Sequence, residues 1–286
     1  ALEACWFRQH IHLLETAGED KEMEALLLKQ RIHIEYLEHV YVKDEKTQKK
    51  EGIKNMEWMS SSMREIEPKN ITNQEQKEKN AKQIAEKVKD GDVIGFGSGS
   101  TSYLAIKEIA KKIEQEELNI TAIPTSYEIK ALCYELKIPT ASILEKRPDW
   151  AFDGADEVDK NNNWIIKGRG AAMFKEKLNM VNAGITYILV DDSKFVDKLN
   201  EKMPIPIEVY PEAVSSVKEA LLDLGATECV LRKAEKKDGP VFTENNNVIL
   251  DTKFTEIYET LEEDIKSITG VIESGLFMEY PVEVLH

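Results

Sequence analysis

The sequence contains few of the residues on which several classes of site depend. Its three cysteines, Cys5, Cys133 and Cys229, lie far apart and form no C-x-x-C pair. We therefore expect free thiols in a reducing cytoplasm rather than disulfides or zinc ligands. No run of about 18 apolar residues is present, and the first residues lack the basic and apolar regions of a secretory signal. These absences predict a cytoplasmic protein that has no membrane partner.

Histidine is almost missing from the part of the chain that carries the other motifs. Four of the five histidines, His10, His12, His33 and His39, precede residue 40, and the fifth is His286. Spacings of two and six residues do not place a ligand pair on one helix face, so surface or packing roles are favoured over a metal site. A histidine-based catalytic mechanism in the rest of the chain is therefore nearly excluded.

Positive charge is in deficit. The chain has 38 Lys and Arg against 53 Asp and Glu, which gives a formal net charge of -15. Such a chain repels polyphosphates, which argues against nucleic acid as its main partner. An anionic substrate would need a local basic pocket. The 286 residues, 42% of them hydrophobic, are enough for one or two globular domains with a real core.

The chain divides into four parts by composition and hydrophobic periodicity. Residues 1–70 combine a helical pattern, in which apolar residues recur at three- and four-residue steps, with a charged linker at 43–52. Residues 71–200 alternate strands and helices, which predicts a Rossmann-like α/β catalytic domain with a mostly parallel sheet. We expect residues 201–269 to form a smaller α+β, ferredoxin-like subdomain that serves as a lid or subunit contact. Residues 270–286 are expected to return to the catalytic domain as a closing strand.

The periodicity predicts individual elements. In the first domain it predicts helices over 74–88, 98–116, 127–136 and 172–181, and strands over 93–96, 119–123, 139–143, 150–152, 164–166 and 187–190. In the remainder it predicts strands over 205–210, 229–232, 248–251 and 270–277, and helices over 212–224 and 255–267. Ligands of such sheets bind at the carboxyl ends of the strands, so the loops at those ends are the candidate sites.

A glycine-rich loop, Gly95 to Thr101, lies between a predicted strand and a predicted helix, where N–H groups and the helix dipole favour an anion. A dinucleotide loop would need a glycine at Ser100 and an acidic residue after the second strand, and both are absent. A Walker A loop would need a lysine after Gly99. The small hydroxyl residues fit a phosphate monoester, and a tight structural turn is the alternative.

Three carboxylates, Asp153, Asp156 and Glu157, follow an apolar strand and precede a segment rich in lysine and glycine at 167–177. They could form a solvated turn, half of a divalent-metal site or a site for proton transfer. The flanking segments favour proton transfer, because neighbouring carboxylates repel and one of them then holds its proton more tightly. Glu176 is either a helix-surface residue or part of this cluster, and Lys194 is either a surface lysine or reaches the same edge.

In combination, these segments resemble the type A ribose-5-phosphate isomerases over residues 74–286. The matching segments, in order, are 95–101, 153–157, 167–177, 192–194 and 270–277. The resemblance implies interconversion of D-ribose 5-phosphate and D-ribulose 5-phosphate in the non-oxidative pentose phosphate pathway, without a metal or an organic cofactor. It also implies a sugar phosphate as the small-molecule partner, and a homodimer or homotetramer.

The resemblance also implies roles for individual residues. Glu176 falls on the base that carries a proton between C2 and C1, and Asp153 falls on the acid that handles the O1 and O2 protons. Lys167 falls on the cation that holds the enediolate oxygen. The other positions implied to contact the substrate are Gly168, Arg169 and Gly170 at that oxygen, and Ser98, Gly99, Ser100, Thr101, Gly154, Ala155, Asp156, Lys194 and Lys77 elsewhere.

The residue types agree with this chemistry. Conversion through an enediolate needs a base at carbon, a proton shuttle between the oxygens and fixed positive charge at the oxyanion. A metal-assisted hydride shift would need a cage of His and carboxylate ligands, which residues 71–285 lack. One rival is the sugar-phosphate-sensing domain of a transcriptional regulator, but the extension shows no basic recognition helix. A related isomerase or deaminase would be expected to use a histidine.

The chain departs from the family pattern in four places. Arg169 stands in a glycine run and would be strained if that position needs a positive φ. Ser98 stands where threonine is common in the family. The chain stops at His286, earlier than family members that continue past the last strand, and residues 1–70 have no counterpart in the pattern.

Overall fold

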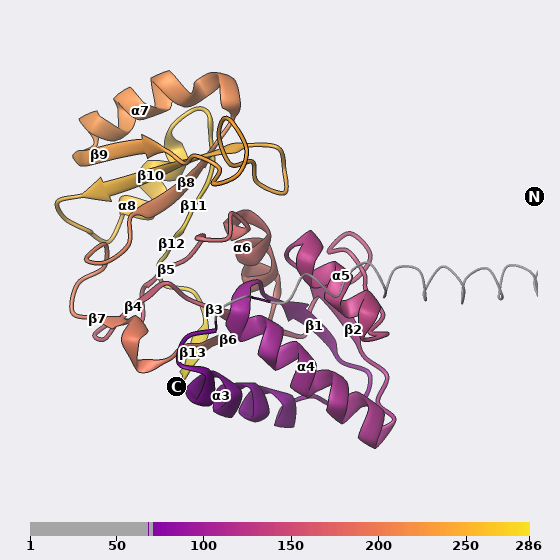
Figure 1. Cartoon of the computed structure of the whole chain (residues 1–286). Helices are drawn as coiled ribbons and strands as arrows, with labels where there is room; N and C mark the ends of the chain where they lie inside the picture. The colour runs from indigo at the N-terminus through magenta and orange to yellow at the C-terminus, as the bar shows by residue number, and fades with distance from the viewer. Residues whose placement is uncertain (1–67, 69–70) are drawn as a thin grey trace, which may run out of the picture. The chain divides into compact units, whose positions relative to one another are not determined.

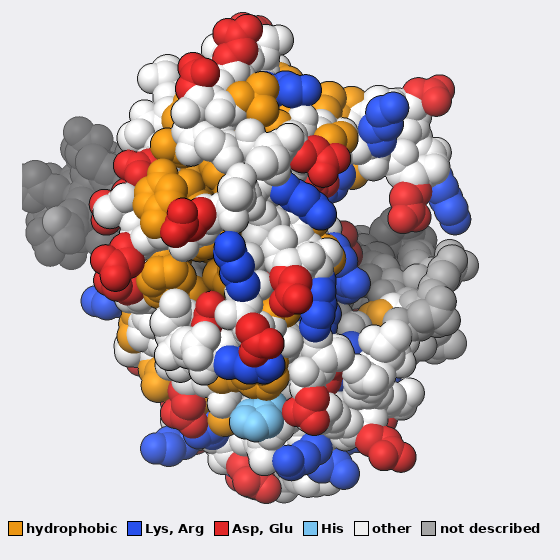
Figure 2. All heavy atoms as spheres, turned by 90° about the vertical axis from the view of Figure 1, so that its left-hand side faces the viewer, with side chains coloured by type: hydrophobic (Ala, Val, Ile, Leu, Met, Phe, Trp, Pro, Cys, Tyr) orange, Lys and Arg blue, Asp and Glu red, His pale blue; other side chains and the backbone are white. Residues whose placement is uncertain are grey.

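The computed structural model describes residue 68 and residues 71–286. The helical extension expected over residues 1–70 therefore lies outside the described residues. Within the described part, no helix is long and apolar enough to cross a membrane. On the face drawn in Figure 2, acidic and basic side chains are interspersed, so an anionic ligand there would meet both signs of charge.

A five-stranded parallel sheet forms the centre of the first domain (Figure 1). Its strands are β1 (Val93–Phe96), β2 (Thr121–Pro124), β3 (Trp150–Gly154), β6 (Thr186–Leu189) and β13 (Val282–Leu285), in the spatial order β13-β6-β3-β1-β2. The strand order reverses between β1 and β3, so the loops that leave these two strands diverge there. Such a switch point, at the carboxyl ends of the strands, is where doubly wound sheets bind ligands.

Helices cover this sheet, and their apolar residues fill its core. Helices α3 (Gln74–Glu86) and α4 (Gly99–Glu116) pack against each other. Ile106 and Ile109 of α4 are fully buried in the same core as Phe96 and Phe152 of the sheet. Helices α5 (Tyr127–Glu135) and α6 (Met173–Asn182) complete the domain. The expected mostly parallel α/β architecture is confirmed.

The strand expected over 139–143 is wrong. Thr140 makes only an isolated bridge to Ala122 of β2, and the chain then turns at Ser142, whose carbonyl accepts from the N–H of Glu145. Pro139 contributes a carbonyl to β2 but has no N–H to donate, so a ladder cannot extend through it. Strand β2 therefore lies at the edge of the five-stranded sheet.

A second, smaller sheet carries the segments around the acidic loop. Its order is β12-β5-β4-β7, with β4 (Glu157–Asp159), β5 (Ile165–Ile166), β7 (Phe195–Val196) and β12 (Leu276–Phe277). The strand expected over 164–166 thus pairs antiparallel with β4 rather than joining the parallel sheet. The one-turn helix η1 (Asp192–Lys194) precedes β7.

The ferredoxin-like subdomain is confirmed by its topology. Its elements follow the order β8 (Ile205–Val209), the one-turn helix η2 (Pro211–Ala213), α7 (Val214–Asp223), β9 (Ala226–Leu231), β10 (Val248–Phe254), α8 (Leu261–Ser267) and β11 (Val271–Ser274). The sheet order β11-β8-β10-β9, with every neighbouring pair antiparallel, is that of the split β-α-β-β-α-β unit. Helix α8 begins at Leu261 rather than near 255, after Thr260, whose hydroxyl donates to Asp264.

The closing segment consists of three strands instead of one. Strand β11 pairs with β8 in the ferredoxin-like sheet, β12 pairs with β5, and β13 pairs with β6 in the parallel sheet. The division at residues 200 and 269 stays a prediction, and strand β11, which lies beyond residue 269, belongs to the sheet of the smaller unit. The chain therefore crosses between the two units at Gly275, between β11 and β12.

Candidate active site

Two loops meet where the strand order reverses. The N–H of Gly97, after β1, donates to the carbonyl of Phe152 in β3 at 2.9 Å, so the first loop lies against the end of β3. A Cβ at Gly97 would lie 2.2 Å from Cγ of Asp153. Only glycine therefore allows the glycine-rich loop to approach this carboxylate.

Asp153, Lys167 and Glu176 come together from three elements at this point. The Lys167 Nζ lies 3.1 Å from Oδ2 of Asp153 and 3.3 Å from Oε2 of Glu176. Asp153 is the penultimate residue of β3, Lys167 follows β5, and Glu176 lies in the first turn of α6. All three are buried, with 4%, 4% and 7% of their surface exposed. The structure thus joins the three residues for which the sequence predicts catalytic roles.

Burial and mutual repulsion control the protonation of these groups. Burial, with the nearby Asp153 carboxylate, raises the pKa of Glu176 to about 8, although Lys167 acts in the opposite direction. Burial also raises the pKa of Asp153, again against the effect of Lys167. Burial alone would lower the pKa of Lys167, but its two carboxylate partners outweigh burial and raise it. The site therefore holds a permanent cation beside a carboxyl group that titrates near neutral pH.

Backbone contacts fix the position of Lys167. Its N–H donates to the carbonyl of Gly275 at 2.8 Å, and its Nζ donates to the carbonyl of Gly154 at 2.6 Å. A Cβ at Gly275 would lie 2.1 Å from the carbonyl oxygen of Lys167, so the two backbones can approach only because residue 275 is glycine. Both the backbone and the ammonium group of Lys167 are therefore fixed by hydrogen bonds.

The glycine-rich loop opens α4 beside Lys77, on which the charges of Lys194 and Arg169 also act. Ser98 and Thr125 share a hydrogen bond of 2.7 Å between their hydroxyls, and Lys77 donates to the Ser100 hydroxyl at 3.4 Å. Burial lowers the pKa of Lys77, and the charges of Lys194 and Arg169 lower it further while Asp191 opposes them. Cations beside the N-terminus of an 18-residue helix suit a phosphate group.

The segment after Lys167 differs from expectation at Arg169. Arg169 does not adopt a positive φ, whereas Gly168 and Ala171 do, with φ of 107° and 64°. The strain expected at Arg169 therefore falls on Ala171. The Arg169 N–H donates to Oδ2 of Asp156 at 3.1 Å, and its guanidinium Nε lies 3.9 Å from Oδ1. This pair links the acidic loop to the segment that follows Lys167.

Glu157 does not join the other carboxylates, which corrects the expected cluster of three. It is fully buried and accepts hydrogen bonds of 2.5 to 2.7 Å from the N–H groups of Asn200, Lys202 and Met203. Its side chain therefore holds the 200–203 turn. The alternation of strand β4 turns it away from Asp156, which is visible in the sequence only once β4 is recognised as a strand.

The structure adds residues that the sequence did not indicate. Arg232 donates from Nη1 to the carbonyls of Gly168 and Arg169, at 2.8 and 3.0 Å, and is itself held by Asp251. Thr125 is buried and contacts Ser98 as described above. No local motif marks either position, because each reaches the site from a distant part of the chain.

The predicted site residues thus fall into two adjoining groups. Asp153, Asp156, Lys167 and Glu176 interact with one another, and Lys77 interacts with Ser100, Lys194 and Arg169. The backbone N–H of Ser98 donates to Asp153 and connects the two groups. The remaining predicted positions lie in the same segments: Gly99 and Thr101 in the first turn of α4, Gly154 and Ala155 after Asp153, and Gly168 and Gly170 after Lys167. Among the described residues, no group of three or more His, Cys, Asp or Glu is arranged to hold a metal ion.

Comparison with known proteins identifies relatives of the chain. The sequence model of the family described as ribose 5-phosphate isomerase A (phosphoriboisomerase A) matches residues 121–286. Ribose-5-phosphate isomerase A of Methanocaldococcus jannaschii is 45% identical over 209 residues, which are 72% of this chain and 92% of the relative. The protein of the same name from Pyrococcus horikoshii is 44% identical over 210 residues, which are 72% and 91% of the two chains.

Solved structures agree with these sequence matches. The structure of ribose 5-phosphate isomerase A from M. jannaschii superposes with a TM-score of 0.72 at 44% identity, covering 74% of this chain and 95% of that chain. A D-ribose-5-phosphate isomerase in complex with phospho-erythronic acid superposes with a TM-score of 0.71 at 43% identity, covering 75% and 95%.

Proposed function

The chain belongs to the ribose 5-phosphate isomerase A family, and we propose that Asp153, Lys167 and Glu176 perform the interconversion of D-ribose 5-phosphate and D-ribulose 5-phosphate. The enzyme is an aldose–ketose isomerase. The observation that carries the assignment of residues is the buried contact of one ammonium with two carboxylates. The presence of all three groups also favours an enzyme over a sugar-phosphate sensor.

In the proposed mechanism, the Glu176 carboxylate removes the proton from C2 of the open-chain aldose and returns it to C1. The electron pair of the broken C–H bond forms the enediolate, whose oxygen is held by the Lys167 ammonium. Asp153 moves a proton between O2 and O1, so that the hydroxyl and the carbonyl exchange places. A base whose pKa of about 8 lies near working pH is well matched to this task.

The magnitudes support this division of roles. A positioned base and a positioned shuttle each contribute typically about 10²- to 10⁴-fold. Fixed charge or hydrogen-bond donors at a developing oxyanion contribute about 3 to 4 kcal/mol. The N–H groups of Gly168, Arg169 and Gly170 are proposed to add such donors to Lys167.

The substrate phosphate is proposed to bind at the start of α4. Ser98, Gly99, Ser100 and Thr101 supply hydroxyl and N–H donors, and Lys77 and Lys194 supply charge. Gly154, Ala155 and Asp156 are proposed to contact the sugar hydroxyls. This arrangement places the local positive charge that a strongly acidic chain needs to bind an anion.

The test is a coupled assay with ribose 5-phosphate that compares wild type with E176Q and with E128Q, a variant of an exposed glutamate on α5. We expect E176Q to lower kcat by roughly 10²- to 10⁴-fold and E128Q to leave it unchanged. Binding of phospho-erythronic acid by E176Q would assign the loss to chemistry rather than to a damaged site. Equal kcat in wild type and E176Q would refute the proposed base, and loss of activity on chelation would instead indicate a metal.

We also propose that the protein is cytoplasmic and assembles as a homodimer or homotetramer through the ferredoxin-like unit. Three apolar side chains of this unit, Tyr210, Val230 and Ile272, are 51%, 48% and 37% exposed, which supports a contact there. Light scattering of the purified chain would give the subunit number, and a monomer at assay concentration would contradict the proposed assembly.

A further inference from the structure

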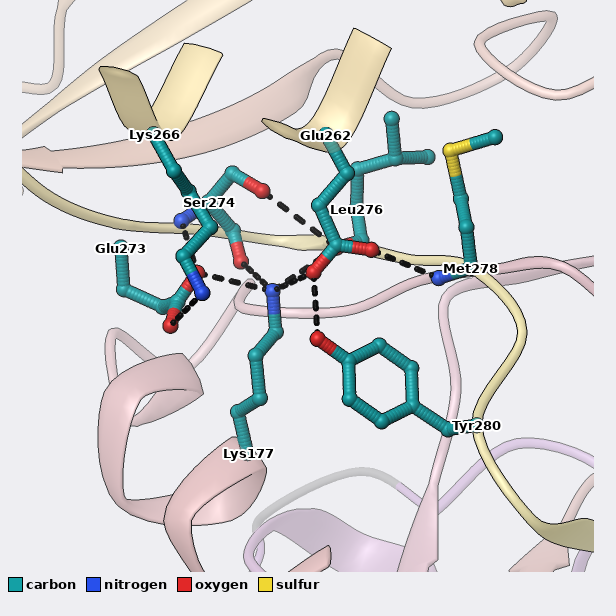
Figure 3. Close-up of polar contacts among 8 residues, drawn as sticks. All are labelled: Lys177, Glu262, Lys266, Glu273, Ser274, Leu276, Met278 and Tyr280. Atoms are coloured by element: carbon teal, nitrogen blue, oxygen red, sulfur yellow. Dashed lines mark hydrogen bonds and ion pairs between the residues drawn. The ribbon is translucent and has the colours of Figure 1, made fainter. Parts of the chain in front are cut away.

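Lys177, the residue after the proposed base, lies in a buried charge network (Figure 3). The Lys177 Nζ lies 2.6 Å from Oε1 of Glu262 in α8 and 2.8 Å from Oε1 of Glu273 in β11. Both carboxylates have further partners, because Glu262 accepts from the Tyr280 hydroxyl and Glu273 pairs with Lys266. Lys177 itself is only 2% exposed.

The Lys177 ammonium also binds the backbone around Gly275, where the chain passes from β11 to β12. It donates to the carbonyls of Ser274 and Leu276 at 3.0 and 2.9 Å. These two residues flank Gly275, whose carbonyl accepts the N–H of Lys167. The Lys177 ammonium therefore fixes both neighbours of the residue that holds the proposed catalytic lysine.

These contacts close a ring through the active site. From Lys177 the ring runs to the 274–276 backbone, from Gly275 to the backbone of Lys167, and from the Lys167 ammonium to Glu176, which precedes Lys177 in α6. Every link is a hydrogen bond, an ion pair or a covalent bond. The distance between the proposed base and the proposed oxyanion cation therefore depends on the contacts of Lys177.

Because this charge network is expensive to desolvate, we infer that it does more than stabilise the fold. Buried ion pairs are expensive to desolvate, and apolar residues of similar volume often stabilise a protein as well or better. Here the two carboxylates come from α8 and β11 of the ferredoxin-like unit, and the lysine comes from the helix that carries the base. The network therefore links α6 directly to α8 and β11 of that unit.

We propose that Lys177 is a positioning residue of the isomerase reaction, which holds Glu176 and Lys167 at their reactive separation by binding the backbone on both sides of Gly275. It does not touch the substrate. The inference rests on the proposed roles of Glu176 and Lys167, because a ring around an inert pair would have no effect on turnover.

The main test variant removes the charges of Lys177 and of its two carboxylate partners together. K177M alone leaves two buried carboxylates without their shared partner, so the triple variant K177M/E262Q/E273Q is made beside it. K177R retains the charge, but a planar guanidinium cannot reproduce the four contacts of an ammonium. L221A, in the fully buried core of the ferredoxin-like unit, serves as the control for lost stability without a change at α6.

We expect kcat with ribose 5-phosphate to fall roughly 10- to 100-fold in the triple variant, since small misplacements of reacting groups cost that much, while KM stays within about twofold. K177R should have an intermediate kcat. The titratable groups that face Glu176 are Asp153 and Asp156 from the β3 end and Lys167 from the β5 end. Looser contact with Lys167 should move the midpoint of the kcat/KM pH profile to higher pH, which L221A should not do.

Each possible result either supports the positioning role of Lys177 or overturns it. A folded triple variant with wild-type kcat and an unshifted pH profile would overturn the inference, and so would an equal loss of kcat in L221A at temperatures well below the Tm of each variant. If K177M does not fold, the triple variant and K177R decide by the same criteria. Wild type without activity on ribose 5-phosphate would instead overturn the proposed function, and the inference with it.

Discussion

The Asp153 carboxyl group occupies the space that any side chain at residue 97 would need. A Cβ at Gly97 would lie 2.2 Å from Cγ and 2.3 Å from Oδ1 of Asp153, and 2.6 Å from its Cα. The absence of a side chain at Gly97 therefore leaves the space that the Asp153 carboxylate occupies. Because Gly97 does not have a positive φ, an alanine there is not strained by its own backbone.

G97A should therefore displace both the Asp153 carboxylate and the backbone of β3 that carries it. The added methyl group forces Asp153 away from Lys167, and a displacement of about 1 Å typically costs about 10²-fold in rate. We expect kcat in the ribose 5-phosphate assay to fall by at least that factor, with the far-ultraviolet circular dichroism unchanged. G91A, where no atom lies within 4 Å of the new Cβ, is the control and should retain activity. Activity of G97A within twofold of wild type would contradict the prediction.

The pH dependence of kcat/KM should report the ionisation of Glu176. The proposed base must be a carboxylate, and burial, with Asp153, raises its pKa to about 8. Below that pH the protonated form dominates, so kcat/KM should rise with pH through a midpoint near 8. The Asp156 charge also raises this pKa, so D156N should move the midpoint to lower pH. A profile that is flat from pH 6 to pH 9 would show that another group limits the reaction.

The same ionisation should lower the stability of the protein as pH rises. The ordinary pKa of a glutamate is 4.5 and that of folded Glu176 is about 8, so between these values the folded chain binds a proton that the unfolded chain has lost. The free energy of unfolding then falls with pH across this window. Each pKa unit corresponds to about 1.4 kcal/mol, so E176Q should gain about 3 to 5 kcal/mol over wild type at pH 9 and much less at pH 5.

Urea unfolding of wild type and E176Q at pH 5 and pH 9 measures this difference, because groups distant from Glu176 contribute equally to both proteins. A gain that is the same at both pH values would mean that Glu176 titrates normally in the folded state.

Lys77 should affect binding of the phosphate and leave chemistry intact. Lys77 is buried, and its ammonium donates to the Ser100 hydroxyl at 3.4 Å. A hydrogen bond to a charged group contributes about 1.5 to 3 kcal/mol. K77M should therefore raise KM for ribose 5-phosphate roughly 10- to 100-fold with kcat nearly constant.

K79M is the matched control for K77M, because Lys79 lies two residues later on the same helix and is exposed. Inhibition by inorganic phosphate gives a second measurement, and K77M should weaken it while K79M should not. If KM and phosphate inhibition change equally in both variants, the effect is one of overall charge and not of a phosphate contact.

The central strands of the parallel sheet, β1 and β3, could be predicted because they are largely buried. Strands β1 and β3 are therefore short apolar runs between turn residues, which is a clear pattern in the sequence. The segment 139–143, expected to be a strand, lacks this pattern, because it contains the hydroxyl residues Thr140 and Ser142 and begins with Pro139, which has no N–H to donate to a ladder. Strands β4 and β12 have only three and two residues, too few for a periodicity to be recognised.

The site could be predicted segment by segment, since each segment carries its own motif. What the sequence could not provide is the set of contacts between segments. Gly275 lies far from Lys167 in the chain, and nothing near it indicates that it supports that backbone. Likewise, Glu157 looked equivalent to Asp156 until the pairing of β4 turned it toward the 200–203 turn.

The position of β13 has a consequence for how the protein folds during synthesis. Strand β6 is made well before its neighbour β13, and the whole ferredoxin-like unit is translated between them. The parallel sheet therefore presents an unpaired edge to the chaperones and to other nascent chains until that unit has emerged. Because this pairing closes a long loop, it is expected to be among the slower steps of folding, and variants that weaken β13 should aggregate during expression more readily than their equilibrium stability suggests.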